Sequence, residues 1–278
     1  MRIVLLFAAS ILAAGTAWAD GFSDAKRAVN AAAHNKYEDA IALYSQALES
    51  GDFAPRELAS LHDKRGVAYA SIGQAERAIA DFDAVLRLKP DYIFARFNRG
   101  VALDAAGRYD DAIADFDATI AYDPQSGAGY FYRGQAKFHA QRFAAAAEDF
   151  AQDVGFTPEH ALGHAWLYLA RARAGGADAR YPLEQAAAAL DLQRWPGPVV
   201  ALYLGKLTPA QLMDATASAD PGVAADRRCQ ADFYSGERDL IAQRRGEAKR
   251  QFALALQHCA VTLSEHVGAR AELLYLDK

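Results

Sequence analysis

Apolar and small residues recur along this chain every 34 positions. Four registers of the pattern hold over three successive copies, namely Gly66, Gly100 and Gly134; Ala78, Ala112 and Ala146; Phe82, Phe116 and Phe150; and Pro90, Pro124 and Pro158. A period of this length is typical of helix–turn–helix units stacked into a solenoid, because each unit buries its apolar face only against its neighbours. The pattern therefore predicts pairs of antiparallel helices in an all-α fold.

The repeats divide the first part of the chain into four units. The pattern predicts a first, weaker repeat with helices over residues 24–34 and 37–49, a short insert at 50–55, and then repeats over residues 59–92, 93–126 and 127–160. Period and residue pattern resemble the tetratricopeptide repeat. This resemblance implies a right-handed α-solenoid that binds other proteins and does no chemistry itself.

Each recurring residue has a physical role at its place in the repeat. Small residues at positions 8 and 20 lie where the two helices of one unit cross closely. The phenylalanine at position 24 fills the space between one unit and the next, and the proline at position 32 ends the second helix. Gly73 and Gly107 end the first helix at position 15, whereas the fourth repeat has Gln141 there.

Beyond residue 160 the strict pattern fades, although helices are still expected. We predict helices over residues 162–174, 183–190 and 199–204, and another that Thr208 caps and Pro209 begins. A last repeat begins at Cys229, and a terminal helix over residues 264–274, capped by Ser264, covers the end of the stack. The expected organisation is a signal peptide (1–19), four repeats (20–160), a degenerate helical region (161–228) and a C-terminal repeat with its capping helix (229–278).

The first 19 residues resemble a secretory signal rather than part of the fold. Arg2 precedes an apolar run over residues 3–14, and Ala17-Trp18-Ala19 offers a cleavage site. The alternative is an N-terminal buried helix. We expect export to the periplasm and a mature chain that starts at Asp20. With no cysteine near the cleavage site, we expect no lipid anchor.

The two cysteines are expected to meet. Cys229 opens the first helix of the last repeat and Cys259 ends the second. Because these helices are antiparallel, the start of one lies beside the end of the other, and an oxidising compartment favours a disulfide there. The alternative is two separate buried thiols.

No combination of residues predicts catalysis, a metal or a cofactor. His160 and His164 have the spacing of a zinc-protease pair, but Ala161 stands where the general base would be needed. The net charge of -5 and the absence of a Lys/Arg cluster argue against nucleic acid as a partner. Arginines recur at position 7, as Arg65, Arg99 and Arg133, and we interpret them as bonds between neighbouring repeats, with an acidic ligand as the alternative.

The first helices of tetratricopeptide repeats line a concave groove, and its side chains are predicted from their repeat positions. The predicted groove residues are Asp63, Val67, Phe94, Phe97, Val101, Phe131, Gln135 and Phe138. Such an aromatic groove with few charges indicates a protein-binding site. The alternative is that some rings pack against a neighbouring helix. Position 5 holds no lysine, so we do not expect the groove to recognise an acidic C-terminal tail.

A second resemblance rests on the segment WPGPVVALYLGKLTPAQLM at residues 195–213. With AWLYLARARAGG before it and FYSGERDLIAQRRGEAKRQFALAL after it, the mature chain resembles the NlpI family of bacterial envelope proteins. The resemblance implies a non-catalytic periplasmic adaptor, often a homodimer, that docks a C-terminal-processing protease and scaffolds peptidoglycan hydrolases. The alternative is a structural or assembly subunit of another envelope complex.

Overall fold

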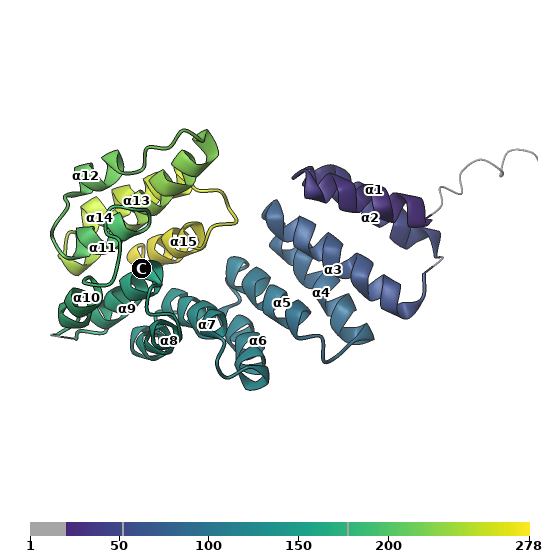
Figure 1. Cartoon of the computed structure of the whole chain (residues 1–278), viewed down its shortest axis with the longest axis horizontal. Coiled ribbons are helices and arrows are strands. Elements are labelled where there is room, and N and C mark those ends of the chain that lie inside the picture. The colour runs from purple at the N-terminus through teal and green to yellow at the C-terminus, as the bar shows by residue number, and fades with distance from the viewer. Residues whose placement is uncertain (1–20, 52, 177) are drawn as a thin grey trace, which may run out of the picture.

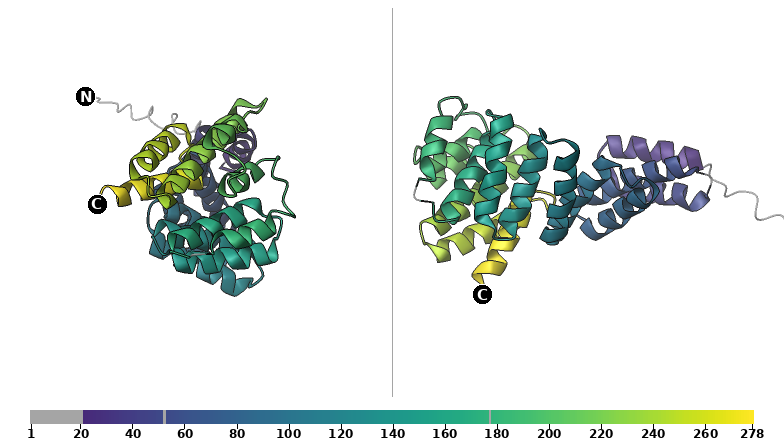
Figure 2. Two further views of the ribbon diagram at one scale, coloured as in Figure 1. Left: turned by 90° about the vertical axis from the view of Figure 1, so that its left-hand side faces the viewer. Right: turned by 90° about the horizontal axis from the view of Figure 1, so that it is seen from below.

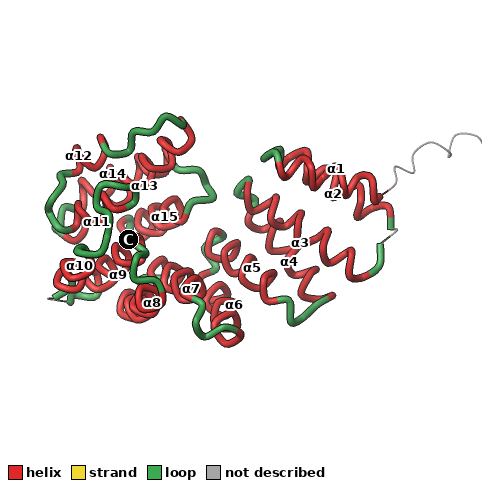
Figure 3. The backbone as a smooth tube through the Cα atoms, viewed as in Figure 1, coloured by secondary structure: helices red, strands yellow, loops and turns green. Residues whose placement is uncertain are grey.

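The computed structural model describes residues 21–51, 53–176 and 178–278, so the expected signal peptide lies outside the described part. Within that part the chain forms fifteen α-helices and no strand (Figure 3). None of the described helices combines the length and apolar character needed to cross a bilayer. The helices are α1 (Gly21–Ala33), α2 (Tyr37–Ser50), α3 (Pro55–Ser71), α4 (Ala75–Leu88), α5 (Ile93–Ala105), α6 (Tyr109–Tyr122), α7 (Gly127–His139), α8 (Phe143–Phe156), α9 (Ala161–Arg173), α10 (Arg180–Ala186), α11 (Gly197–Tyr203), α12 (Pro209–Asp214), α13 (Pro221–Ile241), α14 (Arg245–His258) and α15 (Ser264–Leu276).

Helices α1 to α8 form four consecutive hairpins stacked side by side (Figure 1). The predicted all-α solenoid of helical hairpins is confirmed, and repeats two to four follow the 34-residue register closely. Figure 2 shows the narrow arm of α1 to α4 projecting from a thicker half that holds the later helices. The arm contacts the later helices mainly through α4, which packs against α5.

The glycine and the phenylalanine of the pattern meet inside each repeat. A Cβ atom added to Gly100 would lie 2.9 Å from Cε1 of Phe116, and one added to Gly134 would lie 2.8 Å from Cε1 of Phe150. Phe116 is fully buried, and its ring also lies 6.1 Å, centroid to centroid, from that of Tyr132 in the next repeat. Position 24 therefore packs within its own repeat as well as against the next one.

The turn inside each repeat uses a left-handed backbone conformation. Gly73 and Gly107 adopt φ angles of 73° and 81° there, as expected for residues that end the first helix. Gln141 adopts a φ of 61° at the same position of the fourth repeat. The turn is thus kept without its glycine, at a cost of about 1–2 kcal/mol for a side chain in this region.

The helices between residues 161 and 214 follow the prediction except at α10. Thr208 caps α12 as expected, with its hydroxyl accepting a hydrogen bond from the N–H of Gln211 at 3.2 Å. Helix α10 ends at Ala186, four residues before the predicted end, and starts at Arg180, three residues early. Pro182 lies in its first turn, where the missing N–H of proline leaves no helical hydrogen bond unmade.

Helix α13 starts earlier than predicted. Asp220 caps it, its carboxylate accepting hydrogen bonds from the N–H groups of Gly222 at 2.8 Å and Val223 at 3.3 Å. Cys229 therefore lies inside the helix and does not open it. Its predicted disulfide with Cys259 is nevertheless present, with Cα atoms 4.7 Å apart, and it joins α13 to the residue that follows α14.

Helix α15 turns back over the inner surface of the curved stack. It packs on α13 and α14, its neighbours in sequence, and it also contacts α5 and α7 (Figure 1). The predicted capping role of Ser264 is wrong, because Leu263 occupies the N-cap position and the Ser264 hydroxyl instead donates to Glu265 at 3.2 Å. The terminal helix thus closes part of the groove as well as covering the end of the stack.

Candidate protein-binding groove

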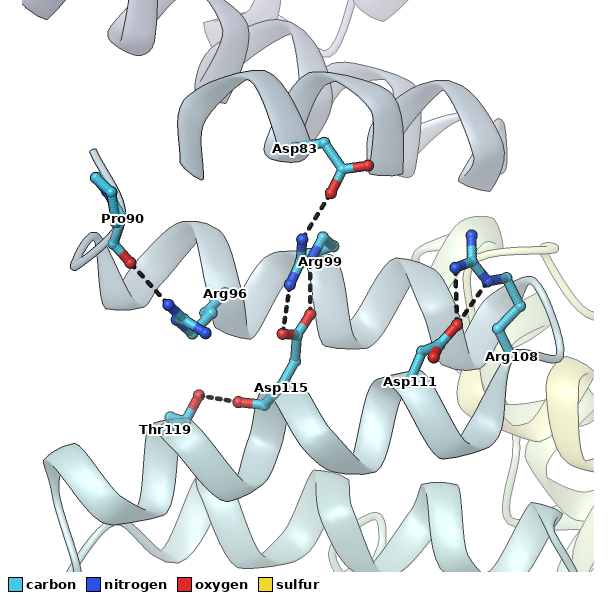
Figure 4. A network of polar contacts seen from close by, with 8 residues as sticks. All are labelled: Asp83, Pro90, Arg96, Arg99, Arg108, Asp111, Asp115 and Thr119. Atoms are coloured by element: carbon cyan, nitrogen blue, oxygen red, sulfur yellow. Dashed lines mark hydrogen bonds and ion pairs between the residues drawn. The ribbon is translucent and has the colours of Figure 1, made fainter. Parts of the chain in front are cut away.

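Arg99 and Arg133 each bind aspartates in two consecutive repeats, whereas Arg65 binds Asp81 of its own repeat and the Ser45 hydroxyl of the preceding one. Arg99 on α5 donates from Nε and Nη2 to both oxygens of Asp115 at 2.7 Å, and from Nη1 to Asp83 of the preceding repeat at 2.6 Å (Figure 4). Arg133 makes the same three bonds to Asp149 and Asp117. The predicted structural role is confirmed, since each guanidinium is already bound by side chains of its own repeat and of the preceding one.

Position 9 of the repeats shows where the groove is open and where it is covered. This position holds Val29, Val67, Val101 and Gln135 on α1, α3, α5 and α7. Val29 and Val67 are 45% and 42% exposed, Val101 is partly buried, and Gln135 is 2% exposed. Helix α15 contacts α5 and α7, and these are the two helices whose position-9 side chains are buried or partly buried. We call the surface formed by the exposed Val29, Val67 and Phe94, together with the partly buried Asp63, the open face.

Close backbone approach seats α15 on the groove. A Cβ atom added to Gly268 would lie 2.7 Å from the Phe233 ring and 3.3 Å from Nε2 of His139. Arg270 donates to the carbonyl oxygen of Ala105 at the end of α5, at 2.6 Å. Glycine at position 268 is therefore required for α15 to lie against α7 and α13.

A buried charged cluster holds the other end of α15. Arg173 on α9 pairs with Glu237 on α13 at 2.7 Å and with Glu272 on α15 at 3.0 Å, and Gln141 donates to Glu272 at 3.0 Å. Burial and the neighbouring charge of Glu272 raise the pKa of Glu237 to about 8. One arginine thus serves two buried glutamates and ties three helices together.

A pocket of about 280 Å³ remains between α15 and the repeats. Its walls include Val101, Phe131 and Gln135 from the predicted groove, and residues 262–265 and Val267 close it from the other side. Glu265 lies in this wall, where its carboxylate accepts hydrogen bonds from Tyr234 and Gln230 at 2.9 and 3.0 Å. Burial raises the pKa of Glu265.

The predicted aromatic residues divide between surface and core. Phe94 is 67% exposed and belongs to the open face. Phe97 and Phe131 are partly buried, with ring centroids 5.7 Å from Phe116 and 5.8 Å from Phe150 respectively. Phe138 is fully buried among other rings, so its side chain offers no surface to a partner. For these last three rings the structure favours the alternative of packing against neighbouring helices.

The histidine pair makes separate contacts. His160 Nδ1 lies 2.7 Å from Asp153, whereas His164 Nε2 lies 2.8 Å from the carbonyl oxygen of Pro158. Over the described residues, no three side chains of the His, Cys, Asp and Glu types are grouped as a metal site would need. The two histidines stabilise the turn between α8 and α9.

Sequence reasoning missed the residues that place α15 in the groove. Arg173, Glu237, Gly268 and Glu272 fall on three helices that are far apart in sequence, and each one matches ordinary helix composition. A charged residue on a helix is most simply interpreted as solvated. The sequence therefore held no signal that set these residues apart from other helix residues.

The fold defines a class of protein: a solenoid-like all-α stack of tetratricopeptide repeats. Residues 25–93 and 95–161 match the family model of the tetratricopeptide repeat. These two segments cover the four hairpins from α1 to α8, except for the first turn of α1 and one residue of α5. No curated protein matches the chain significantly.

Solved structures of MamA proteins share this fold. MamA 41-end from Desulfovibrio magneticus RS-1 is 21% identical with a TM-score of 0.55, covering 60% of this chain and 93% of that chain. A crystal structure of MamA protein is 18% identical with a TM-score of 0.55, covering 60% and 90%. MamA of MSR-1 is 18% identical with a TM-score of 0.53, covering 61% and 95%. At these identities the likeness concerns the fold alone.

Proposed function

We propose that this protein is a non-catalytic periplasmic adaptor that binds another protein in its concave groove, as the resemblance to the NlpI family implies. The observation that carries the proposal is the open face, where Val67 and Phe94 are 42% and 67% exposed on a stack of tetratricopeptide repeats. Exposed apolar surface inside a concave wall is the usual mark of a protein-binding site. The partners we propose are a C-terminal-processing protease and peptidoglycan hydrolases.

Two observations support the periplasm as the compartment. The first is the leader sequence with its Ala17-Trp18-Ala19 cleavage site. The second is the disulfide between Cys229 and Cys259, since disulfides persist in oxidising compartments.

The test is an affinity pull-down of the tagged mature protein from an envelope extract, analysed by mass spectrometry. We expect a C-terminal-processing protease or a murein hydrolase to be enriched, and Val67→Glu to abolish its capture. Leu88→Glu on α4 is the matched control, since Leu88 is 40% exposed and lies outside the groove-lining helices. Capture that survives Val67→Glu would contradict the groove as the binding site.

A second candidate function is a structural or assembly subunit of another envelope complex that uses its terminal helix. Leu274 and Tyr275 on α15 favour it, because they are 61% and 45% exposed beside each other. If this candidate holds, Leu274→Asp removes the captured proteins and Val67→Glu does not. Truncation before α15 would be a poorer test, because it would also remove Glu272, one of the two carboxylates that pair with the buried Arg173.

A further inference from the structure

Asp63 is the charged group of the open face, and part of its carboxylate has no partner. Its Oδ1 atom is enclosed by protein and accepts no hydrogen bond. Lys64 and Lys89 are close enough to lower its pKa somewhat, yet burial is the larger influence and the pKa of Asp63 is raised. Neither lysine forms an ion pair with Asp63, and Lys89 lies over the ring of Tyr92 instead.

Besides the two lysines, exposed apolar side chains lie beside Asp63 on the open face. Val67 follows it by four residues on α3, so both side chains lie on the same face of that helix. Val29 on α1 and Phe94 on α5 extend the exposed apolar surface to the helices on either side. A partner that covers this surface would take water away from the Asp63 carboxylate, whose charge a cation of the partner would then stabilise.

The neighbouring part of the same groove accepts an α-helix. Helix α15 lies against α5 and α7, where it covers Gln135 and leaves Val101 partly buried. The first helices α1, α3 and α5 contact one another in turn, and Val29, Val67 and Val101 occupy position 9 on them. The groove is therefore wide enough for a helix along α5 and α7, where α15 lies. The open face extends the same groove toward α3 and α1.

We propose that the open face binds an amphipathic helix of a protein partner, with apolar side chains against Val29, Val67 and Phe94 and a lysine or arginine paired with Asp63. This proposal rests on the proposed function and specifies its ligand. A basic side chain one helical turn from an apolar one matches the spacing of Asp63 and Val67. Acidic helices are excluded by the same carboxylate.

The test uses a phage library of random 16-residue peptides selected on the immobilised full mature protein. We expect the selected peptides to share apolar residues at helical spacing with one lysine or arginine. For a selected peptide, Asp63→Asn is expected to weaken binding about tenfold in fluorescence anisotropy, the size of a partly desolvated charge pair. Glu76→Gln is the matched control, because it removes an exposed carboxylate from the second helix of the same repeat.

A double-mutant cycle measures whether Asp63 and the basic residue of the peptide interact directly. Replacing the basic residue of the peptide by glutamine should weaken binding to the native protein about tenfold and have no further effect on the Asp63→Asn variant. Circular dichroism of both variants should match the native protein, since each substitution keeps the size of the side chain and breaks no hydrogen bond of Asp63. Peptides without a basic residue, independent effects of the two changes, or no selected peptide at all would each overturn the proposal.

The outcome is separable from that of the proposed function. Envelope partners that depend on Val67 but contain no basic helix would overturn this inference and leave the adaptor function standing. Basic helical peptides that bind through Asp63, without any envelope protein captured in the pull-down, would support the site and contradict the adaptor function.

Discussion

Gly100→Ala tests whether the close approach of α5 to Phe116 explains the glycine at position 8. The added Cβ would lie 2.9 Å from Cε1 and 3.0 Å from Cζ of Phe116. Carbon atoms pack favourably at about 3.5–4.0 Å. The Phe116 ring is fully buried and contacts Phe97 and Tyr132, so it has little room to move away.

The expected magnitude is the difference between two opposing effects. Overpacking a buried site costs about 1–3 kcal/mol, whereas alanine is favoured over glycine inside a helix by about 1 kcal/mol. Gly100→Ala is therefore expected to lower the free energy of unfolding by up to about 2 kcal/mol. Gly155→Ala on α8 is the matched control, because nothing lies within 4 Å of its added Cβ, and it should raise stability by about 0.5–1 kcal/mol.

Urea and thermal unfolding followed by circular dichroism measure both variants, with about 2–4 °C in Tm expected per kcal/mol. Phe116→Leu provides a second background in which the ring is absent. There Gly100→Ala should no longer destabilise, because the contact that opposes it has been removed. Equal stabilisation by Gly100→Ala and Gly155→Ala, or an equal loss in both backgrounds, would refute the reasoning.

Three further predictions concern the packing and charges of the C-terminal half and of the groove. Replacing Cys229 and Cys259 by serine should lower the free energy of unfolding by about 3.6 kcal/mol, given their sequence separation of 30, and urea unfolding should then be insensitive to reductant. Phe131→Ala should lower stability by about 2–3 kcal/mol in the same assay, because its ring packs against three others; an unchanged midpoint would show a free surface ring. Native stability should fall as pH rises from about 4.5 to about 8, because folded Glu237 keeps a proton that the unfolded chain releases. Glu237→Gln should flatten this dependence in Tm measured across that range, and an unchanged slope would contradict the assignment.

The repeat part of the fold followed from local pattern. Small residues, phenylalanines and prolines at 34-residue spacing placed the helices of repeats two to four within a few residues of their observed bounds. The structural role of Arg99 could also be predicted from the pattern. The arginine recurs beside the packed glycine of each repeat, and this position faces the neighbouring repeat, where Arg99 binds Asp83. These features depend on contacts within a repeat or between adjacent repeats.

Helix bounds outside the strict repeats were harder to predict. The repeat register places the start of α13 at Cys229, although Asp220 and Pro221 form a helix-start signal of their own. The helix begins at this local signal and not at the repeat boundary, because the Asp220 side chain satisfies N–H groups of the first turn that would otherwise have no partner. The cysteine pairing was still correct, since antiparallel packing of α13 and α14 does not depend on where α13 begins.

The sequence by itself determined that this chain stacks helical hairpins and that its groove carries apolar side chains with few charges. Only the tertiary structure decided which part of that groove is open. The curvature of the stack accumulates over many repeats, and it brings α15 onto α5 and α7, more than 120 residues away in the chain. Burial at Val67 and Gln135 therefore differs although both occupy position 9, because exposure depends on what the whole solenoid places opposite each residue.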